Sequence, residues 1–74
     1  MNRIMAQLRK EDSNVLRVLL DGRANPRHIQ NETGLDKAET YTSLRRLSRL
    51  DYVTKIARGL YEITDEGRAA LESE

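Results

Sequence analysis

The tightest constraint in the sequence is the turn Gly34-Leu35-Asp36, where one residue separates the end of one helix from the start of the next. Gly34 is predicted to take the left-handed conformation that lets a chain turn sharply after a helix. Asp36 is a capping residue for the following helix, about residues 37–50. Asn25-Pro26 opens the short preceding helix, which Ile29 anchors. Two short helices joined this tightly must cross steeply, so we expect a helix-turn-helix arrangement.

An apolar stripe at helical spacing predicts another helix before this pair. It consists of Val15, Leu16, Leu19 and Leu20, with Asp12-Ser13 as the expected N-cap and Asp21-Gly22 as the end. In the third helix, the inner face is predicted to hold Thr40, Leu44, Leu47 and Leu50. Each of these helices therefore has an apolar face to bury.

After Asp51 the pattern becomes typical of strands. Residues 52–57 and 60–64 are rich in β-branched and aromatic side chains and flank Arg58-Gly59, which predicts a hairpin with a two-residue loop. In that register four side chains share the core face, as the pairs Ile56–Tyr61 and Thr54–Ile63. Lys55 then lies opposite Glu62 on the outer face.

A closing helix is predicted after the hairpin. Thr64 is placed to cap it, with Asp65 and Glu66 in its first turn and a short apolar strip at 69–71. The expected fold is mainly α with a small β-hairpin (α+β), in the order three helices, two strands, one helix. We expect one domain over residues 12–74. The preceding segment, 1–11, is either an extra helix or a dimer contact.

Length and composition narrow the class of protein. A chain of 74 residues is too small for a large active-site cleft between domains. The longest uncharged apolar run, Val18–Leu20, excludes a bilayer span, and Arg3, Gln7 and Arg9 interrupt any secretory signal. The absence of cysteine excludes disulfides and thiolate metal sites. These features predict a cytoplasmic protein.

The inventory of reactive side chains argues against an enzyme. The chain has one histidine, His28, and no pair of carboxylates in an apolar setting. A lone histidine at the start of a short helix is typical of a solvated surface rather than of a catalytic base or a metal ligand. We therefore expect no catalytic residue, no metal and no cofactor.

Two groups of residues carry a resemblance to a known family. The first group follows the family's order of glycine, cap, recognition helix and strand start. It comprises the turn at 34–36, the apolar pair Leu44 and Leu47, and Asp51-Tyr52-Val53. Residues 58–68 resemble the wing and closing helix of MarR-like regulators, which have a winged helix-turn-helix fold. Over residues 12–72 the chain looks most like the small winged-helix repressors of haloarchaeal phages and their chromosomal relatives. The resemblance implies an archaeal or viral regulator of transcription, located in the host cytoplasm if viral.

The outer face of the third helix indicates DNA contact. At 100° per residue, the face opposite the core holds Ala38, Thr42, Arg45 and Arg49, flanked by Tyr41 and Arg46. A helix that is only solubilised interleaves Glu and Lys, whereas residues 40–50 contain three arginines and no acid. Residues 37–58 carry six basic and two acidic residues, while 59–74 carry one basic and five acidic. We expect a basic surface that meets double-stranded DNA with one face, in a sequence-specific transcriptional repressor.

The expected contacts follow from position on the helix and wing. The N-terminal half of a recognition helix enters the major groove, so base contacts are predicted at Lys37, Ala38, Tyr41 and Thr42. Arg45 is predicted to reach a guanine edge or a phosphate, and Arg46 and Arg49 to hold phosphates. The resemblance implies phosphate contacts for Arg27 and His28. Arg58 at the wing tip is predicted to contact the adjacent minor groove or its phosphates. Lys55 is a weaker candidate for a DNA contact, because Glu62 is placed to neutralise it.

The size of the domain predicts a homodimer, because one such module seldom supplies operator-level affinity alone. The expected dimer contacts are Ile4, Met5, Leu8 and Leu71, with packing of Ile4 and Met5 on their own domain as an equal alternative. No small-molecule effector is expected in so small a core.

Two other functions stay open. A protein-interaction module in a transcription or nucleoprotein assembly would expose apolar anchors on the third helix, and RNA binding would need an aromatic stacking platform.

Overall fold

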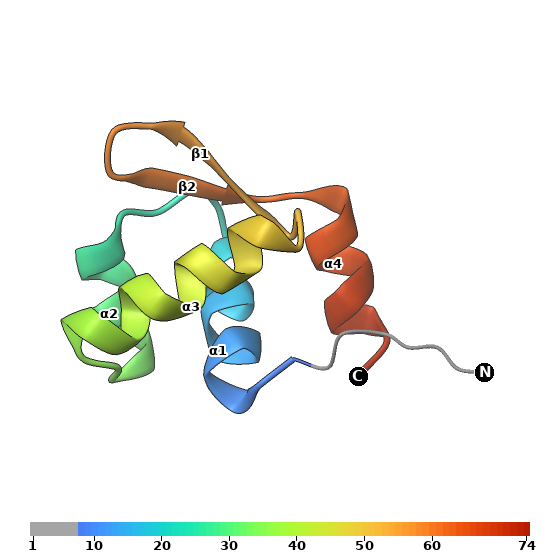
Figure 1. Cartoon of the computed structure of the whole chain (residues 1–74), viewed down its shortest axis with the longest axis horizontal. Helices are drawn as coiled ribbons and strands as arrows, with labels where there is room; N and C mark the ends of the chain where they lie inside the picture. The colour runs from blue at the N-terminus through green and yellow to red at the C-terminus, as the bar shows by residue number, and fades with distance from the viewer. Residues whose placement is uncertain (1–7) are drawn as a thin grey trace.

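The computed structural model describes residues 8–74 and has the expected order of elements (Figure 1). They are α1 (Lys10–Leu20), α2 (Pro26–Thr33), α3 (Lys37–Arg49), β1 (Val53–Ala57), β2 (Leu60–Ile63) and α4 (Asp65–Glu72). The two strands form an antiparallel hairpin, so the predicted fold class is confirmed. Within the described residues, no helix combines the length and the hydropathy that a bilayer span requires.

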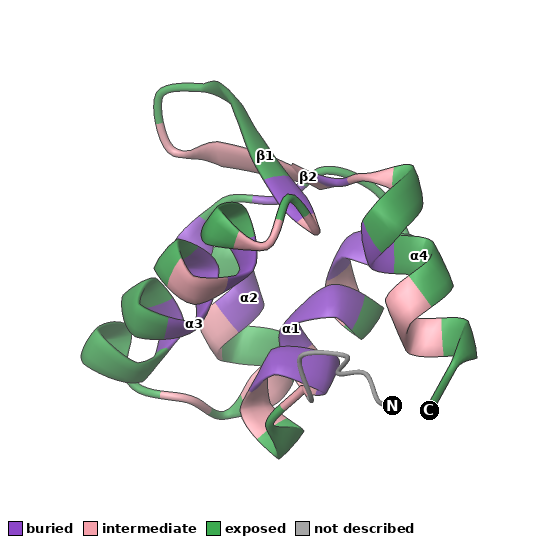
Figure 2. Ribbon diagram, turned by 45° about the vertical axis from the view of Figure 1, so that its right-hand side comes forward, coloured by how far each residue is buried: buried purple, intermediate pink, exposed green. Residues whose placement is uncertain are grey.

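The core lies where α1, α2, α3 and the base of the hairpin meet, and the buried faces of these elements turn toward one another (Figure 2). Its apolar members are Val15, Leu16, Leu19, Ala24, Ile29, Leu44, Leu47, Val53 and Ile63. Leu20 was expected in the apolar stripe of α1, and this expectation is wrong, because 49% of Leu20 is exposed. It is the last residue of α1, and the buried face of the helix is formed by Val15, Leu16 and Leu19.

The caps around the helix-turn-helix are as predicted. The Asn25 side chain accepts a hydrogen bond from the His28 backbone N–H (2.8 Å), and Asp36 accepts one from the Glu39 N–H (2.8 Å). Gly34 ends α2 in the left-handed conformation, with φ +79°. At the start of α4, the Thr64 hydroxyl accepts from the Gly67 N–H at 3.0 Å. These interactions are local in sequence, which is why the residue types alone predicted them.

The start of α1 differs from the prediction. The helix begins at Lys10 with Arg9 as its N-cap, so Asp12-Ser13 is not the cap. Asp12 is the third residue of the helix, and its carboxylate accepts a hydrogen bond from the Arg9 backbone N–H (3.3 Å). Asp12 and Ser13 are both buried, which an exposed capping pair would not be.

The predicted strand register is correct at the loop and wrong beyond it. Ala57 pairs with Leu60 across the two-residue loop, but Ile56 is an extra residue that forms a β-bulge. Every later pair is therefore shifted by one, so that Lys55 faces Tyr61, Thr54 faces Glu62, and Val53 faces Ile63. The core face of the hairpin contains Val53 and Ile63, whereas Thr54 is exposed and Ile56 is 38% exposed.

The hairpin is joined to the connection between α1 and α2 near its loop end, at the second residue of β2. Ala24 and Tyr61 exchange two backbone hydrogen bonds, of 3.0 and 2.9 Å. At the base of the hairpin, the Thr64 hydroxyl donates to the carbonyl oxygen of Asp51 (2.6 Å), which fixes the start of α4. The hairpin is thus held at its base and again at Tyr61, and its loop extends from the body of the domain (Figure 1).

Candidate nucleic-acid interface

The outward face of α3 is the one that the helical spacing predicted. Thr40, Ser43, Leu44 and Leu47 are buried, which turns Ala38, Thr42, Arg45 and Arg49 to the surface, and all four are exposed. The acid of α3, Glu39, caps the helix by accepting a hydrogen bond from the Asp36 N–H (2.9 Å). Small side chains and two arginines therefore make up an exposed strip of this helix.

Arg46 has a different position from the one expected. Its guanidinium makes two hydrogen bonds to the Asp12 carboxylate, from Nε (3.0 Å) and from Nη2 (2.7 Å). The Ser43 hydroxyl donates to the same carboxylate at 2.7 Å, and only 2% of the Asp12 side chain is exposed. Arg46 thus ties α3 to α1 and neutralises a buried acid, whereas the sequence suggested a free phosphate contact.

Asp12 is held in its charged form by these partners. Burial opposes ionisation, but hydrogen bonds from Arg46, Ser43 and the Arg9 backbone outweigh it, so the pKa of Asp12 lies below its ordinary value. The same pairing raises the pKa of Arg46. Sequence reasoning missed this network because the two residues are 34 positions apart. An acid at the third position of a helix fits a capping role equally well.

An open cleft of about 720 Å³ separates α3 from the hairpin. Leu44 and Val53 lie at its floor, since both are buried. Its rim is formed by Tyr41, Arg45 and Ser48 from α3, by Thr54, Lys55 and Tyr61 from the hairpin, and by Asp51, Thr64 and Glu66 near the start of α4.

Lys55 lines this cleft, so the reason for which it was ranked low as a DNA contact, its pairing with Glu62, does not hold. The bulge moves Glu62 opposite Thr54, and the Glu62 carboxylate approaches Arg23 instead, at 3.8 Å. The lysine is therefore available to the cleft together with Arg45.

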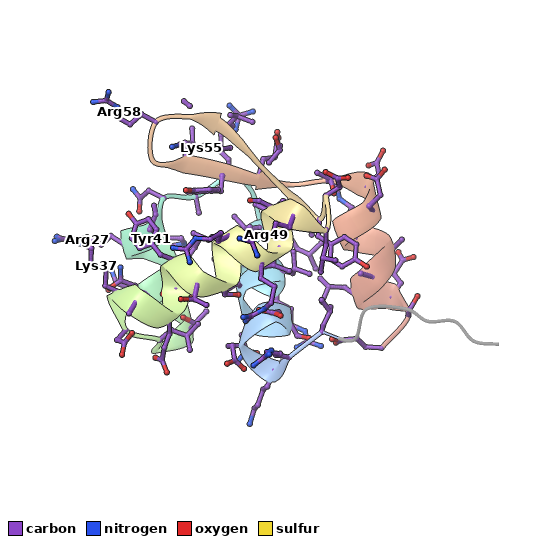
Figure 3. The ribbon with its side chains drawn as sticks, viewed as in Figure 1. Arg27, Lys37, Tyr41, Arg49, Lys55 and Arg58 are labelled. Atoms are coloured by element: carbon purple, nitrogen blue, oxygen red, sulfur yellow. The ribbon has the colours of Figure 1, made fainter. Side chains whose placement is uncertain are left out.

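A second hollow, of about 370 Å³, lies between the start of α2, the start of α3 and the wing turn. It is lined by Asn25, Pro26, Arg27, Gln30, Lys37, Tyr41 and Gly59. Figure 3 shows Arg27, Lys37 and Arg58 at this end of the molecule, with Arg58 directed away from the body at the wing tip. Tyr41 lines both hollows, so it lies at their junction.

The remaining expected contacts lie elsewhere on the surface. Ala38 and Thr42 line a smaller hollow of about 230 Å³ with Arg9, Glu11, Glu39 and Arg46, on the flank of α3 away from the wing. His28 is exposed in the first turn of α2. Among residues 8–74, no three acidic or histidine side chains gather as metal ligands.

The expected dimer contacts are only partly within the described residues. Ile4 and Met5 lie outside them. Leu8 and Leu71 are half-buried and pack against the core of their own domain. The role of these residues between subunits stays a prediction.

The fold has clear counterparts among solved structures. BpsR from Bordetella bronchiseptica, whose DNA binding is regulated by 6-hydroxynicotinic acid, matches 92% of this chain and 53% of its own, with a TM-score of 0.85 and 25% identity. The MarR family transcriptional regulator SPO1453 from Silicibacter pomeroyi matches 89% of this chain and 50% of its own, with a TM-score of 0.81 and 25% identity. The adhesin competence repressor AdcR from Streptococcus pyogenes has 17% identity and a TM-score of 0.77, over 89% of this chain and 54% of its own.

Sequence comparison alone does not reach these proteins. No protein-family profile matches the chain, and no curated protein is detectably similar to it. The chain spans about half the length of the regulators that it matches in structure. These neighbours are regulators of transcription rather than enzymes. Their shared architecture and the element order of α1 to α4 identify the chain as a MarR-like winged helix-turn-helix domain.

Proposed function

We propose that this domain is a sequence-specific, double-stranded DNA-binding regulator of transcription, acting as a repressor. The observation that carries the proposal is the exposed strip of α3, which presents Arg45 and Arg49 beside the small residues Ala38 and Thr42. A helix with small side chains can approach base edges closely, and arginine binds both guanine edges and phosphates. In this proposal α3 lies in the major groove, and Arg58 reaches the adjacent minor groove or its backbone.

The contacts divide by chemistry. Ala38 and Thr42 meet base edges, Arg45 meets a guanine edge or a phosphate, and Arg49 holds a phosphate. Arg27 and His28, in the first turn of α2, contact the DNA backbone, and Arg27 lines the hollow beside the start of α3. Arg46 is left out of this interface because its guanidinium is bound to Asp12.

The regulator is proposed to act as a homodimer, since one module of this size gives limited affinity and two half-sites multiply it. The protein-interaction alternative has less support. Within residues 8–74 the exposed large hydrophobic side chains are Leu20, Tyr41 and Ile56, and none lies in the outward strip of α3. A protein-binding face would need such anchors.

The test is selection of bound sequences from a random duplex pool, followed by salt titration on the selected site. Affinity should fall steeply with salt, because phosphate neutralisation releases counterions. Arg49→Ala should weaken binding to selected and random duplexes alike, whereas Thr42→Ala should change base preference.

Arg68→Ala is the matched control. It removes one exposed arginine from α4, where Arg68 pairs with Asp65 (2.8 Å), and should leave affinity unchanged. No binding to any duplex, or binding that does not depend on salt, would refute the proposed function.

A further inference from the structure

Two hollows adjoin on the wing side of α3. Tyr41 lines both the cleft between α3 and the hairpin and the hollow between α2, α3 and the wing turn, so the two hollows meet at this residue. We use "the trough" for these two hollows together. It runs along the wing-side flank of α3, where Tyr41 and Ser48 line it, and it shares Arg45 with the exposed strip, whereas Thr42 lies on the opposite flank.

Charge is separated along the trough. Its basic part includes Arg27 and Lys37 in the smaller hollow and Arg45 and Lys55 in the larger one. Its acidic end holds Asp51, in the turn after α3, and Glu66, in the first turn of α4. The acidic end is fixed in place, since the Thr64 hydroxyl binds the Asp51 carbonyl oxygen at 2.6 Å. A polyanion is therefore attracted to one part of the trough and repelled from the other.

We propose that one sugar–phosphate strand of the duplex lies in the basic part of the trough, with Tyr41 at its centre, and leaves it before Asp51. Lys37 and Tyr41, which the sequence suggested as base contacts, hold this backbone together with Lys55. The inference rests on the proposed function, and it assigns Lys55 a role in DNA binding for the first time. Reading of bases is left to the exposed strip of α3.

The chemistry of the trough fits a backbone better than a base. Its basic part presents ammonium, guanidinium and hydroxyl groups, the last from Tyr41, Ser48, Thr54 and Tyr61. Lysine and hydroxyl donors are the usual partners of phosphate oxygens.

The test measures affinity for the selected site and for a random duplex over a series of salt concentrations. Lys55→Gln and Lys37→Gln should each weaken binding to both duplexes by the same factor, about threefold to tenfold, and lower the salt slope by about 1. Tyr41→Phe should weaken both duplexes equally with little change in slope, since it removes a hydroxyl and no charge. All three positions are exposed, so circular dichroism should show an unchanged fold.

The acidic end provides a test by gain of affinity. Asp51→Asn should strengthen binding to both duplexes by about twofold to fivefold, since it removes a charge that repels phosphate. Asparagine keeps the left-handed backbone of this position, φ +63°. Asp65→Asn is the control, because Asp65 is a neighbouring exposed acid of α4 that does not line the trough.

The outcomes separate this inference from the proposed function. If the wild-type domain binds duplex DNA but the Lys37 or Lys55 variants alter base preference, or leave the affinity and salt slope unchanged, the trough does not hold a strand. If the wild-type domain binds no duplex, both proposals fall.

Discussion

Thr40 is the residue whose environment departs most from chemical expectation. In the described part of the chain, its hydroxyl is the buried side-chain polar atom without a hydrogen-bond partner. A buried polar group left unpaired costs about 1–3 kcal/mol. Valine has nearly the same shape and a similar helix propensity. Thr40→Val should therefore raise the free energy of unfolding by about 1 kcal/mol, measured from urea denaturation.

The matched comparison is Thr40→Ala, which also removes the hydroxyl but leaves a cavity. It should be less stable than the valine variant. A valine variant that is less stable than the wild type would mean that the hydroxyl has a partner in solution.

Gly67 lies where α4 passes closest to the start of the hairpin. A Cβ at this position would come within 2.8 Å of the Ile63 Cγ1 atom and would also overlap the Tyr52 carbonyl oxygen. Alanine normally stabilises a helix relative to glycine by about 0.5–1 kcal/mol. Here Gly67→Ala should instead destabilise the fold by about 1–3 kcal/mol, because the backbone must move apart. Ala69→Gly, at an exposed position of α4, supplies the ordinary glycine effect for comparison in the same thermal unfolding experiment.

Among single residues, the sequence predicted what depends on near neighbours. Asn25, Gly34, Asp36 and Thr64 act within three or four positions of themselves, and their roles were predicted correctly. The pairing of Asp12 with Arg46 depends on how α1 packs against α3. No local pattern encodes that packing, so Asp12 was wrongly assigned as a cap and its pairing with Arg46 was missed.

At the scale of elements, the ion pair of Asp12 and Arg46 joins α1 to α3 and makes the free energy of unfolding depend on pH. Because the pKa of Asp12 is lowered by folding, its contribution is complete above the unfolded value of about 3.9. The contribution is lost as pH falls through the lower, folded value. Asp12→Asn should cost about 2–3 kcal/mol at neutral pH, since it leaves Arg46 without its acid. Urea midpoints measured from pH 6 to pH 2 should show the wild type and the variant converging. A difference that does not vary with pH would contradict this account.

The sequence pattern predicted the hairpin but not its strand register. Its existence, its strands and its two-residue loop were predicted, since they follow from composition and a turn pair. The register was not, because one bulged residue, Ile56, shifts every pair between it and the base. The error affected the candidate site, since it placed Glu62 beside Lys55 and removed that lysine from consideration.

At the scale of the whole molecule, the near-zero net charge conceals two unlike regions. Arg27, Lys37, Arg45 and Lys55 line the two adjoining hollows beside the wing, whereas the chain from residue 59 onward carries five acids and one base. The sequence predicted this division, because the charges separate along the chain as well as in space. The trough could not be predicted, since it is formed by α2, α3 and the hairpin, which are brought together only by the tertiary fold.

The double hydrogen bond between Ala24 and Tyr61 divides the wing into two mechanical parts. Next to the bulge, Tyr61 of β2 pairs with Lys55 of β1 on one edge and with Ala24 of the α1–α2 connection on the other, so opening the hairpin here would disturb this connection as well. Beyond Ile56 only the Ala57–Leu60 pair and the Arg58-Gly59 loop remain. This loop end can therefore bend while the rest of the hairpin keeps its orientation to α3, and under the proposed function such bending lets Arg58 follow minor grooves of different widths.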